Sequence, residues 1–521
     1  MEMTHPKLVQ PQMFNDSFLQ SVLAQLSDED KRLLIPEANA ASQKSVPVKL
    51  SGRVSTNGWD TVCAVRASDL NRAIKEKKTY PENIDYQFID DGATASIKST
   101  FGPWAISPGG DGSNINVKIP LQNGSFSYDG AEYSLDGGEA IAQVKLSYFP
   151  EVLNSPAPGN YDLKVSLSSK DPHVPVVSVI QYENKEHKLP KLMAGAFKEV
   201  LNEWLTQNLA KFDAIFSTVS LESLSEETEF KWLKSTFMSY AYTDTGSLAT
   251  SVFGVLCMTN NRSPISLARQ IDGACLQGEE KACFVIKKEL FAKYQFLPAL
   301  PFAFDNASAS DFSLNKTENG ITAKNLKLSS VRYGAIDYHP EVENFEVWFE
   351  QTYIRTKTKV RTSISPGIES IVTITTYQTL KLSEKNGKQY IEYETTQEPD
   401  ITKTTEVSAG VIVTEAIAGI ILAVAAIVAG EVIKEVVKKV IVCIIIAIVA
   451  ALISIVIHEI IDACVGGHVS DKIPSISPMV QMATRQILWP MCDPQKPDGF
   501  KLEHVFYNDS LVLCGSPAYL L

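Results

Sequence analysis

The segment "HEIIDACVGGH", from His458 to His468, holds residue types that could bind a metal ion. A zinc protease of the HExxH type needs two histidines four positions apart on one helix face, with the glutamate acting as the base. Asp462 occupies the position where that second histidine is needed. We therefore expect no metal centre, and we interpret these polar residues as a cap at the end of an apolar helix.

A glycine-rich stretch, "SPGGDGSN" (residues 107–114), has the composition of a phosphate-binding loop. A P-loop requires GxxxxGK[ST] between a strand and a helix. This stretch lacks the lysine and is followed by "INVKIPL", which alternates like a strand, so we expect a hairpin turn. The sequence also lacks a GxSxG motif and a recognisable Cys/His context. It predicts a protein that is not an enzyme and needs no cofactor.

Eight cysteines are scattered along the chain, and no two of them form a CxxC pair. This pattern is typical of reduced, mostly buried thiols rather than of a zinc site or a disulfide framework. A bond between Cys275 and Cys283 is the alternative.

The chain has 521 residues, of which 45% are hydrophobic and 21% charged, and its net charge is −12. These values predict a globular protein of two or three domains. An acidic protein lacks the basic surface that a nucleic-acid partner requires, so nucleic acid is not expected as a partner. The first residues, "MEMTHPKLVQPQMFNDSF", do not have the pattern of a signal peptide. We expect synthesis in the cytoplasm and release by a non-classical route.

Several elements can be predicted from periodicity. Residues 14–34 form an amphipathic helix, and with the linker that follows they make an N-terminal unit, residues 1–50, whose role is open. "WDTVCAVRA" (59–67) is a strand, and the next residues form a helix capped by Ser68 and Asp69. Alternating segments elsewhere predict antiparallel strands, with Asn386 and Gly387 as a hairpin turn. The predicted fold class is α+β.

The clearest amphipathic helix is predicted over residues 197–219. One face of it is apolar and could line a lipid groove, although such a face is more often plain core. The groove candidates on this face are Trp204, Leu205, Leu209, Phe212 and Phe216.

An apolar region covers residues 411–461, with two uncharged runs at 416–430 and 440–457. It could form one long helix of about 75 Å inside the fold. Alternatively, residues 430–439 could be the tip of a helical hairpin that inserts into a membrane. The membrane-contact candidates are Ile420, Ile421, Leu422, Ile444, Ile445, Ile446 and Leu452.

An ordered series of short motifs resembles a known family. The motifs include "TNGWDTVCAVRASDLNRAI", "FGPWAISPGGDGSNINVKIPL", "LNEWLTQNLAKFDAIFSTV" and "FVIKKELFAKYQFLPAL". They resemble the clostridial forty-seven-kilodalton proteins and their OrfX relatives, which are encoded in botulinum-type and insecticidal toxin gene clusters. The resemblance implies an elongated TULIP-like fold, in which curved antiparallel sheets wrap around long helices. It divides the chain into halves at 51–225 and 226–521, and it carries over no catalytic residues.

The resemblance further implies a lipid- or membrane-binding accessory protein of a secreted toxin system, whose partners are a lipid surface and other proteins of the cluster. A membrane-inserting insecticidal or cytolytic toxin that uses residues 411–461 is one alternative. A scaffold that binds toxin partners is the other. The oligomeric state stays open.

Overall fold

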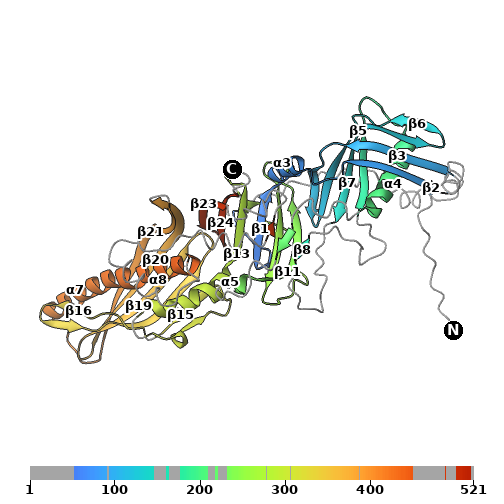
Figure 1. Ribbon diagram of the computed structural model, residues 1–521. Helices are drawn as coiled ribbons and strands as arrows, with labels where there is room; N and C mark the ends of the chain where they lie inside the picture. Colours follow the sequence, from blue (N-terminus) through green and yellow to red (C-terminus); the bar gives the residue numbers. More distant parts are fainter. Residues whose placement is uncertain are drawn as a thin grey trace, which may run out of the picture.

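The computed structural model describes residues 52–90, 93–145, 160–162, 177–208, 218–220, 231–276, 278–304, 307–324, 326–385, 388–449, 487–488 and 500–517. The described part is elongated and consists mainly of β-sheet, with few helices (Figure 1). Every pairing recorded between described strands is antiparallel. The predicted antiparallel sheets with few helices are confirmed, whereas the N-terminal helix predicted over 14–34 lies outside the described residues.

The largest sheet has 13 strands in the order β2-β3-β5-β4-β11-β12-β1-β13-β24-β23, with β6 and β7 paired to β5 and β9 paired to β7. Its strands are β1 (Thr61–Arg66), β2 (Asn83–Asp90), β3 (Ala93–Phe101), β4 (Ala105–Gly112), β5 (Asn114–Tyr128), β6 (Ala131–Ser134), β7 (Glu139–Lys145), β9 (Val177–Glu183), β11 (Ser235–Thr243), β12 (Val252–Thr259), β13 (Ala282–Lys287), β23 (Phe500–Tyr507) and β24 (Ser510–Pro517). Because β1 pairs with β12 and β13, this sheet contains strands from both expected halves of the chain.

Two helices pack on this sheet, α3 (Ala67–Lys77) and α4 (Lys191–Gln207). The predicted strand-then-helix succession at β1 and α3 is confirmed. The predicted cap is wrong, because the N-cap residue is Arg66 and no side chain caps the helix. The helix predicted over 197–219 is also wrong at its end, because α4 stops at Gln207 and residues 218–220 form strand β10.

The glycine-rich stretch forms the predicted hairpin turn between β4 and β5, with Asp111 opposite Asn114. Gly109 and Gly112 have φ angles of 102° and 59°, which residues with a side chain rarely adopt. The backbone N–H of Gly109 donates to a carboxylate oxygen of Asp244 at 2.7 Å. The glycines therefore serve the turn geometry.

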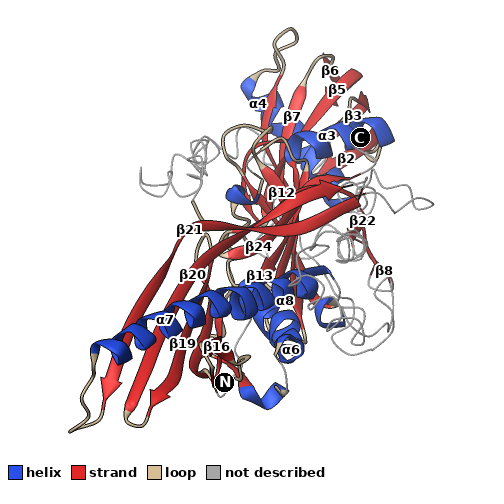
Figure 2. Cartoon of the chain, turned by 90° about the vertical axis from the view of Figure 1, so that its left-hand side faces the viewer, coloured by secondary structure: helices blue, strands red, loops and turns tan. Residues whose placement is uncertain are grey.

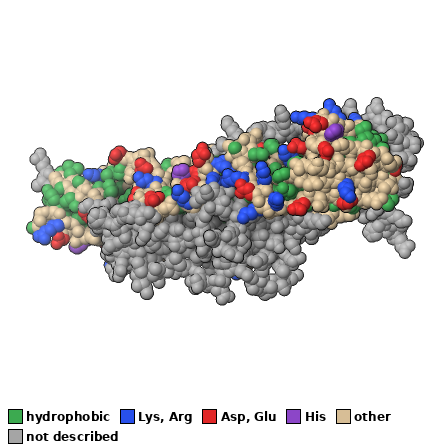
Figure 3. All heavy atoms as spheres, turned by 45° about the horizontal axis from the view of Figure 1, so that its top comes forward, with side chains coloured by type: hydrophobic (Ala, Val, Ile, Leu, Met, Phe, Trp, Pro, Cys, Tyr) green, Lys and Arg blue, Asp and Glu red, His purple; other side chains and the backbone are tan. Residues whose placement is uncertain are grey.

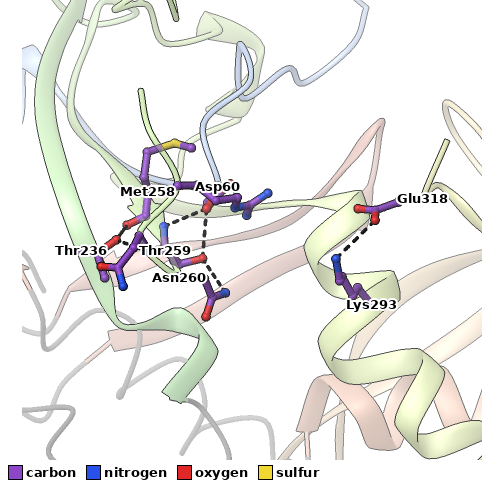
Figure 4. A network of polar contacts seen from close by, with 9 residues as sticks. Asp60, Thr236, Met258, Thr259, Asn260, Lys293 and Glu318 are labelled. Carbon is purple, nitrogen blue, oxygen red and sulfur yellow. Dashed lines mark hydrogen bonds and ion pairs between the residues drawn. The ribbon is translucent and has the colours of Figure 1, made fainter. Parts of the chain in front are cut away.

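A buried polar network joins the start of β1 to the end of β12 (Figure 4). The side chain of Asp60 is fully buried. Its Oδ2 accepts hydrogen bonds from the Thr259 backbone N–H at 2.8 Å and from the Thr259 hydroxyl at 3.0 Å. Its Oδ1 forms an ion pair with Arg262. A buried carboxylate needs such partners, since an unpaired charge is costly away from water.

The six cysteines in the described part of the chain are buried and unpaired. Burial raises the pKa of Cys257 to about 11 and also raises the pKa of Cys63 and Cys283. These thiols are neutral near physiological pH and therefore poor nucleophiles. Cys275 and Cys283, the expected alternative pair, are both free.

The C-terminal hairpin β23–β24 joins the sheet through the pairing of β24 with β13, and the His504 ring on β23 contacts the Glu280 carboxylate, forming an ion pair when the imidazole is protonated. The other Glu280 oxygen accepts the Gly278 backbone N–H at 2.8 Å. Burial alone raises the pKa of Glu280, but its bonds to His504 and to backbone N–H groups outweigh burial and lower that pKa. The ionised form of Glu280 therefore stabilises the folded protein.

This ion pair predicts a pH effect. A carboxyl whose pKa is lowered by folding contributes stability above its unfolded pKa, about 4.3, and this contribution is lost as the pH falls through the folded value. Between about pH 5 and pH 3, the free energy of unfolding should therefore fall less steeply in Glu280→Gln than in the wild type. Urea titrations at several pH values measure this slope. The neighbouring exposed Glu279→Gln should keep the wild-type slope; equal slopes in all three proteins would contradict the assignment.

The second large sheet has six strands in the order β14-β15-β18-β19-β20-β21. They are β14 (Phe312–Leu314), β15 (Gly320–Ala323), β18 (Glu341–Phe349), β19 (Ile354–Ser365), β20 (Ile368–Lys385) and β21 (Lys388–Val407). Lys385 lies opposite Lys388, so β20 and β21 pair as a hairpin, while Asn386 and Gly387, where the turn was predicted, lie outside the described residues. At the sheet edge, the only pairing recorded for β21 among the described residues is with β20.

Smaller elements complete the described chain. A two-stranded sheet consists of β16 (Val331–Tyr333) and β17 (Ile336–Tyr338). A three-stranded sheet consists of β8 (Asn160–Asp162), β10 (Thr218–Ser220) and β22 (Ile487–Leu488). The remaining short helices are η4 (Lys231–Leu233), η5 (Gly273–Cys275), α5 (Lys288–Phe291), η6 (Ala292–Phe296), α6 (Leu297–Ala299), η7 (Leu300–Ala303) and η8 (Ala309–Asp311).

Aromatic rings join the two large sheets. Phe349, at the end of β18, packs edge-to-face against Phe291 of α5 and Phe296 of η6, with ring centroids 5.5 and 5.7 Å apart. It also contacts Tyr507 of β23 at 5.7 Å. The six-stranded sheet is thereby fixed to the C-terminal hairpin of the 13-stranded sheet.

Candidate functional site

A continuous helical run lies along the six-stranded sheet (Figure 2). It consists of α7 (Glu415–Glu431), the π-helical η9 (Val432–Val437) and α8 (Lys438–Val449), with no break between them. The Thr414 hydroxyl caps α7 by accepting the Ile417 backbone N–H at 3.4 Å. We call residues 307–449, which comprise this run, β14 to β21 and the β16–β17 hairpin, the helical lobe. Residues 430–439 are helical, so they do not form the tip of a hairpin in this structure.

The buried side of the run is a row of branched apolar residues at every fourth position. Each is at most 1% exposed: Val424, Val428, Val432, Val436, Val440 and Ile444. The exposed positions of α7 are Gly419, Leu422, Ala426 and Gly430, and Leu422 is 64% exposed. Between Glu415 and Glu431 the helix has no charged residue on any side.

The sheet face beneath the run carries polar side chains among apolar ones. Alternate residues of β19 and β20 are buried, as expected for strands with one covered face. Several of these buried residues have hydroxyl groups with no hydrogen-bond partner among the described residues, namely Thr356, Thr358, Thr362 and Ser370. We call these four the buried hydroxyl row. It makes the helix–sheet interface less stable than a fully apolar one.

The buried hydroxyl row predicts that Thr358→Val stabilises the protein. Valine has the shape of threonine without the hydroxyl, so the variant removes an unpaired polar group at little steric cost. We expect a gain of about 1 kcal/mol in the free energy of unfolding, measured by urea denaturation. Thr373→Val, on the opposite face of β20, should change it by less than about 0.5 kcal/mol. A loss of stability in Thr358→Val would show that this hydroxyl has a partner.

The structure separates the predicted membrane-contact residues. Ile421 and Ile444 are buried in the lobe, Ile420 is half-buried, and Leu422 is exposed. Ile445 and Ile446 belong to α8, and their side chains are not described, while Leu452 lies outside the described residues. Within the described chain, no helix is both long and apolar enough to cross a bilayer.

The predicted groove residues lie far from this lobe in the fold. Trp204 and Leu205 belong to α4 and are buried against β3 and β9, with the Trp204 ring 5.5 Å from the Phe101 ring. Leu209, Phe212 and Phe216 lie outside the described residues. The structure therefore places the two described candidates in a packed core.

Sequence reasoning missed an exposed apolar cluster at the end of the helical lobe. Of the ten large hydrophobic side chains that stand most exposed in the described chain, seven belong to this lobe: Tyr333, Ile336, Ile401, Val407, Ile412, Val413 and Leu422. Figure 3 shows hydrophobic side chains gathered at the end of the molecule where Figure 1 places α7 and β16. The signal in the sequence is "SAGVIVT" (408–414), a turn without a charged residue.

A separate hollow of about 600 Å³ lies beside the 260–272 loop. Trp59 and Phe237 line it, and so do Arg262 and Arg269; no histidine, cysteine or carboxylate is among its lining residues. The described residues also hold no group of three or more His, Cys, Asp or Glu side chains that could bind a metal ion. The residues that line this hollow therefore do not form a typical acid–base or metal site.

The fold defines an elongated antiparallel protein of the architecture seen in two solved P47 structures. The alignment with the P47 structure from Clostridium botulinum A2 has a TM-score of 0.63 at 18% sequence identity. It covers 89% of this chain and 99% of the P47 chain. The P47 structure from C. botulinum E1 has a TM-score of 0.57, also at 18% identity, and covers 88% and 99%. At this identity, the likeness concerns the fold alone.

Sequence comparison gives the family. The family model described as "OrfX-like: Protein OrfX2/OrfX3/P47" matches residues 56–515, so the chain belongs to the OrfX/P47 family of clostridial toxin-cluster proteins. Protein OrfX3 of Paraclostridium bifermentans is 31% identical over 382 residues, 67% of this chain and 77% of that protein. Protein P47 of C. botulinum (strain Kyoto / Type A2) is 23% identical over 308 residues, 56% of this chain and 69% of that protein. The resemblance noted from the motifs is confirmed.

Proposed function

We propose that this chain is a non-enzymatic accessory protein of a secreted toxin system and that it binds lipid or a membrane surface through the helical lobe. In this proposal the lobe is TULIP-like, with the helical run as the long helix and the six-stranded sheet as its curved wrapping. Family membership supports the toxin-system role and makes other proteins of the cluster the natural protein partners.

One observation carries the lipid-binding part. A helix on a protein surface normally presents charged or polar residues to water. The exposed positions of α7 instead present Gly419, Leu422, Ala426 and Gly430. A helix without a polar side is stable where protein or lipid covers it, so an apolar ligand or a bilayer fits this side of α7.

The non-enzymatic part rests on the chemistry of the side chains. The hollow beside the 260–272 loop lacks an acid, a base and a nucleophilic thiol, and burial raises the pKa of the described thiols Cys63, Cys257 and Cys283. Binding alone therefore accounts best for the side chains described.

Liposome flotation of the purified full chain, followed by an alkaline carbonate wash, tests the proposal. We expect the protein to float with liposomes and to be released by the wash, because the buried apolar side of the helical run is packed inside the helical lobe. Lipid analysis of the purified protein is the second readout. A chain that carries no lipid and ignores all liposomes would refute the proposal.

The same uncharged helix favours one alternative, a toxin that inserts the helical run into a membrane. Insertion requires the run to leave the sheet, and the buried hydroxyl row weakens that contact. Protein that floats and resists the carbonate wash, together with dye release from liposomes, would favour the toxin over the accessory protein.

A further inference from the structure

Two separate turns bring exposed apolar side chains to the same end of the helical lobe. The first turn, residues 408–414, joins β21 to α7 and carries Ile412, which is 81% exposed, and Val413. The second is the β16–β17 hairpin, whose turn is flanked by Tyr333 and Ile336. Strand β16 packs against α7, and Figure 1 shows it beside this helix. We call Tyr333, Ile336, Ile412 and Val413 the apolar end.

The backbone holds the first turn in place. The Ser408 N–H donates to the Gly367 carbonyl at 2.8 Å, and the Val411 N–H donates to the Ser408 carbonyl at 3.1 Å. A Cβ added at Gly367, whose φ is 79°, would lie 3.0 Å from the Val411 side chain. Val411 therefore lies close to Gly367 in the β19–β20 turn, and the next two residues, Ile412 and Val413, are exposed to solvent.

Two arginines near the apolar end are paired with carboxylates. Arg332 lies 3.9 Å from Asp337, in the residue pair next to Tyr333 and Ile336. Arg361 forms ion pairs with Glu343 and Glu406, behind the first turn. Hydrogen bonds from Lys359 and Arg361 lower the pKa of Glu343, and the bond from Arg361 lowers the pKa of Glu406, so these carboxylates offset the positive charges beside them. This end therefore has no excess of positive charge with which to attract anionic lipid.

We propose that the apolar end docks on the interface of a lipid bilayer and that zwitterionic lipid suffices for this contact. The inference rests on the proposed function and names its contact surface. Short turns that project aliphatic side chains suit shallow entry into a bilayer, whereas a protein partner normally covers a broad, shaped patch. Tyrosine suits the depth of the lipid headgroups, because its ring is apolar and its hydroxyl is polar.

The test is co-sedimentation of the full chain with phosphatidylcholine vesicles. We expect the wild type to sediment with them, and the double variant Ile412→Asp/Val413→Asp to lose at least about tenfold in its partition coefficient. Ile336→Asp should show a loss in the same direction. The matched control is Ile265→Asp, which replaces a side chain 83% exposed on the 260–272 loop, away from the apolar end; its partitioning should equal that of the wild type.

The Ile412→Trp variant gives an independent readout, since no large core residue is removed. The fluorescence of the added indole should shift to the blue when phosphatidylcholine vesicles are present. Vesicles containing phosphatidylglycerol should bind the wild type no more than about threefold better.

The outcomes separate the two proposals. If the wild type binds neither kind of vesicle and carries no lipid, the proposed function fails. If the wild type binds while the aspartate variants bind equally well, or if the fluorescence of the Ile412→Trp variant does not shift, only the apolar end is refuted. Binding that requires anionic lipid would refute the neutral-lipid part.

Discussion

Replacing Phe349 with alanine is expected to lower the free energy of unfolding by about 3–5 kcal/mol, the range measured for the removal of a buried phenylalanine ring. The ring lies between Phe291, Phe296 and Tyr507, so its loss leaves a cavity where the helical lobe meets the C-terminal hairpin. Because the cavity forms at the contact between two sheets, we also expect the helical lobe to unfold separately from the rest. Differential scanning calorimetry should resolve two unfolding transitions in the variant and a single transition in the wild type.

Phe349→Leu is the matched control, since leucine fills most of the space and should cost less than half as much as alanine, roughly 1–2 kcal/mol. If Phe349→Ala were to lower stability without changing the number of transitions, the ring would serve the core but not the connection between the sheets.

Replacing Asp60 with alanine is expected to cost about 1.5–3 kcal/mol, because it removes a buried carboxylate that accepts hydrogen bonds from Thr259 and pairs with the partly exposed Arg262. The variant leaves the Thr259 N–H and hydroxyl without their acceptor, and leaves Arg262 without its carboxylate. Since this network ties β1 to the end of β12, the central strands of the largest sheet should lose protection against hydrogen exchange. Urea denaturation and amide exchange measure the two effects.

Exposed ion pairs provide the control for Asp60. Asp85 pairs with Lys98 at 3.2 Å, and both side chains are largely exposed. Water and salt screen such a pair, so Asp85→Ala should change stability by less than about 1 kcal/mol. Asp60→Asn, which keeps an acceptor oxygen but no charge, should fall between the two. An Asp60→Ala protein as stable as Asp85→Ala would show that Arg262 and Thr259 find other partners.

Local sequence patterns predicted the type of several elements. The strand β1 and helix α3 follow from alternation and from the inward positions of Leu70, Ala73 and Ile74, which are buried. The β20–β21 hairpin follows from Asn386 and Gly387 between two alternating arms. In both cases a local pattern indicates the type of element, whereas the pairing of β1 with β12 and β13 joins residues far apart in the chain.

The long-range features could not be predicted in this way. Whether residues 430–439 form a turn or a helix depends on the sheet against which η9 packs, and no local residue decides it. A Cβ at Gly430 would meet nothing within 4 Å, so the surroundings of this residue do not require a glycine. The apolar end was missed for the same reason: Ile412 and Tyr333 are far apart in sequence, and only the fold places both turns at one end.

Strand β21 is 20 residues long and, at about 3.3 Å per residue, presents roughly 66 Å of sheet edge. An edge of this length invites another chain to add a strand and begin an aggregate. The exposed stretch of β21 carries Glu392, Glu394, Glu398, Asp400, Lys403 and Glu406, and its register with β20 skips Glu398 and Pro399. Like charges and an irregular, proline-containing backbone both oppose strand addition. This edge is therefore protected against amyloid-like association.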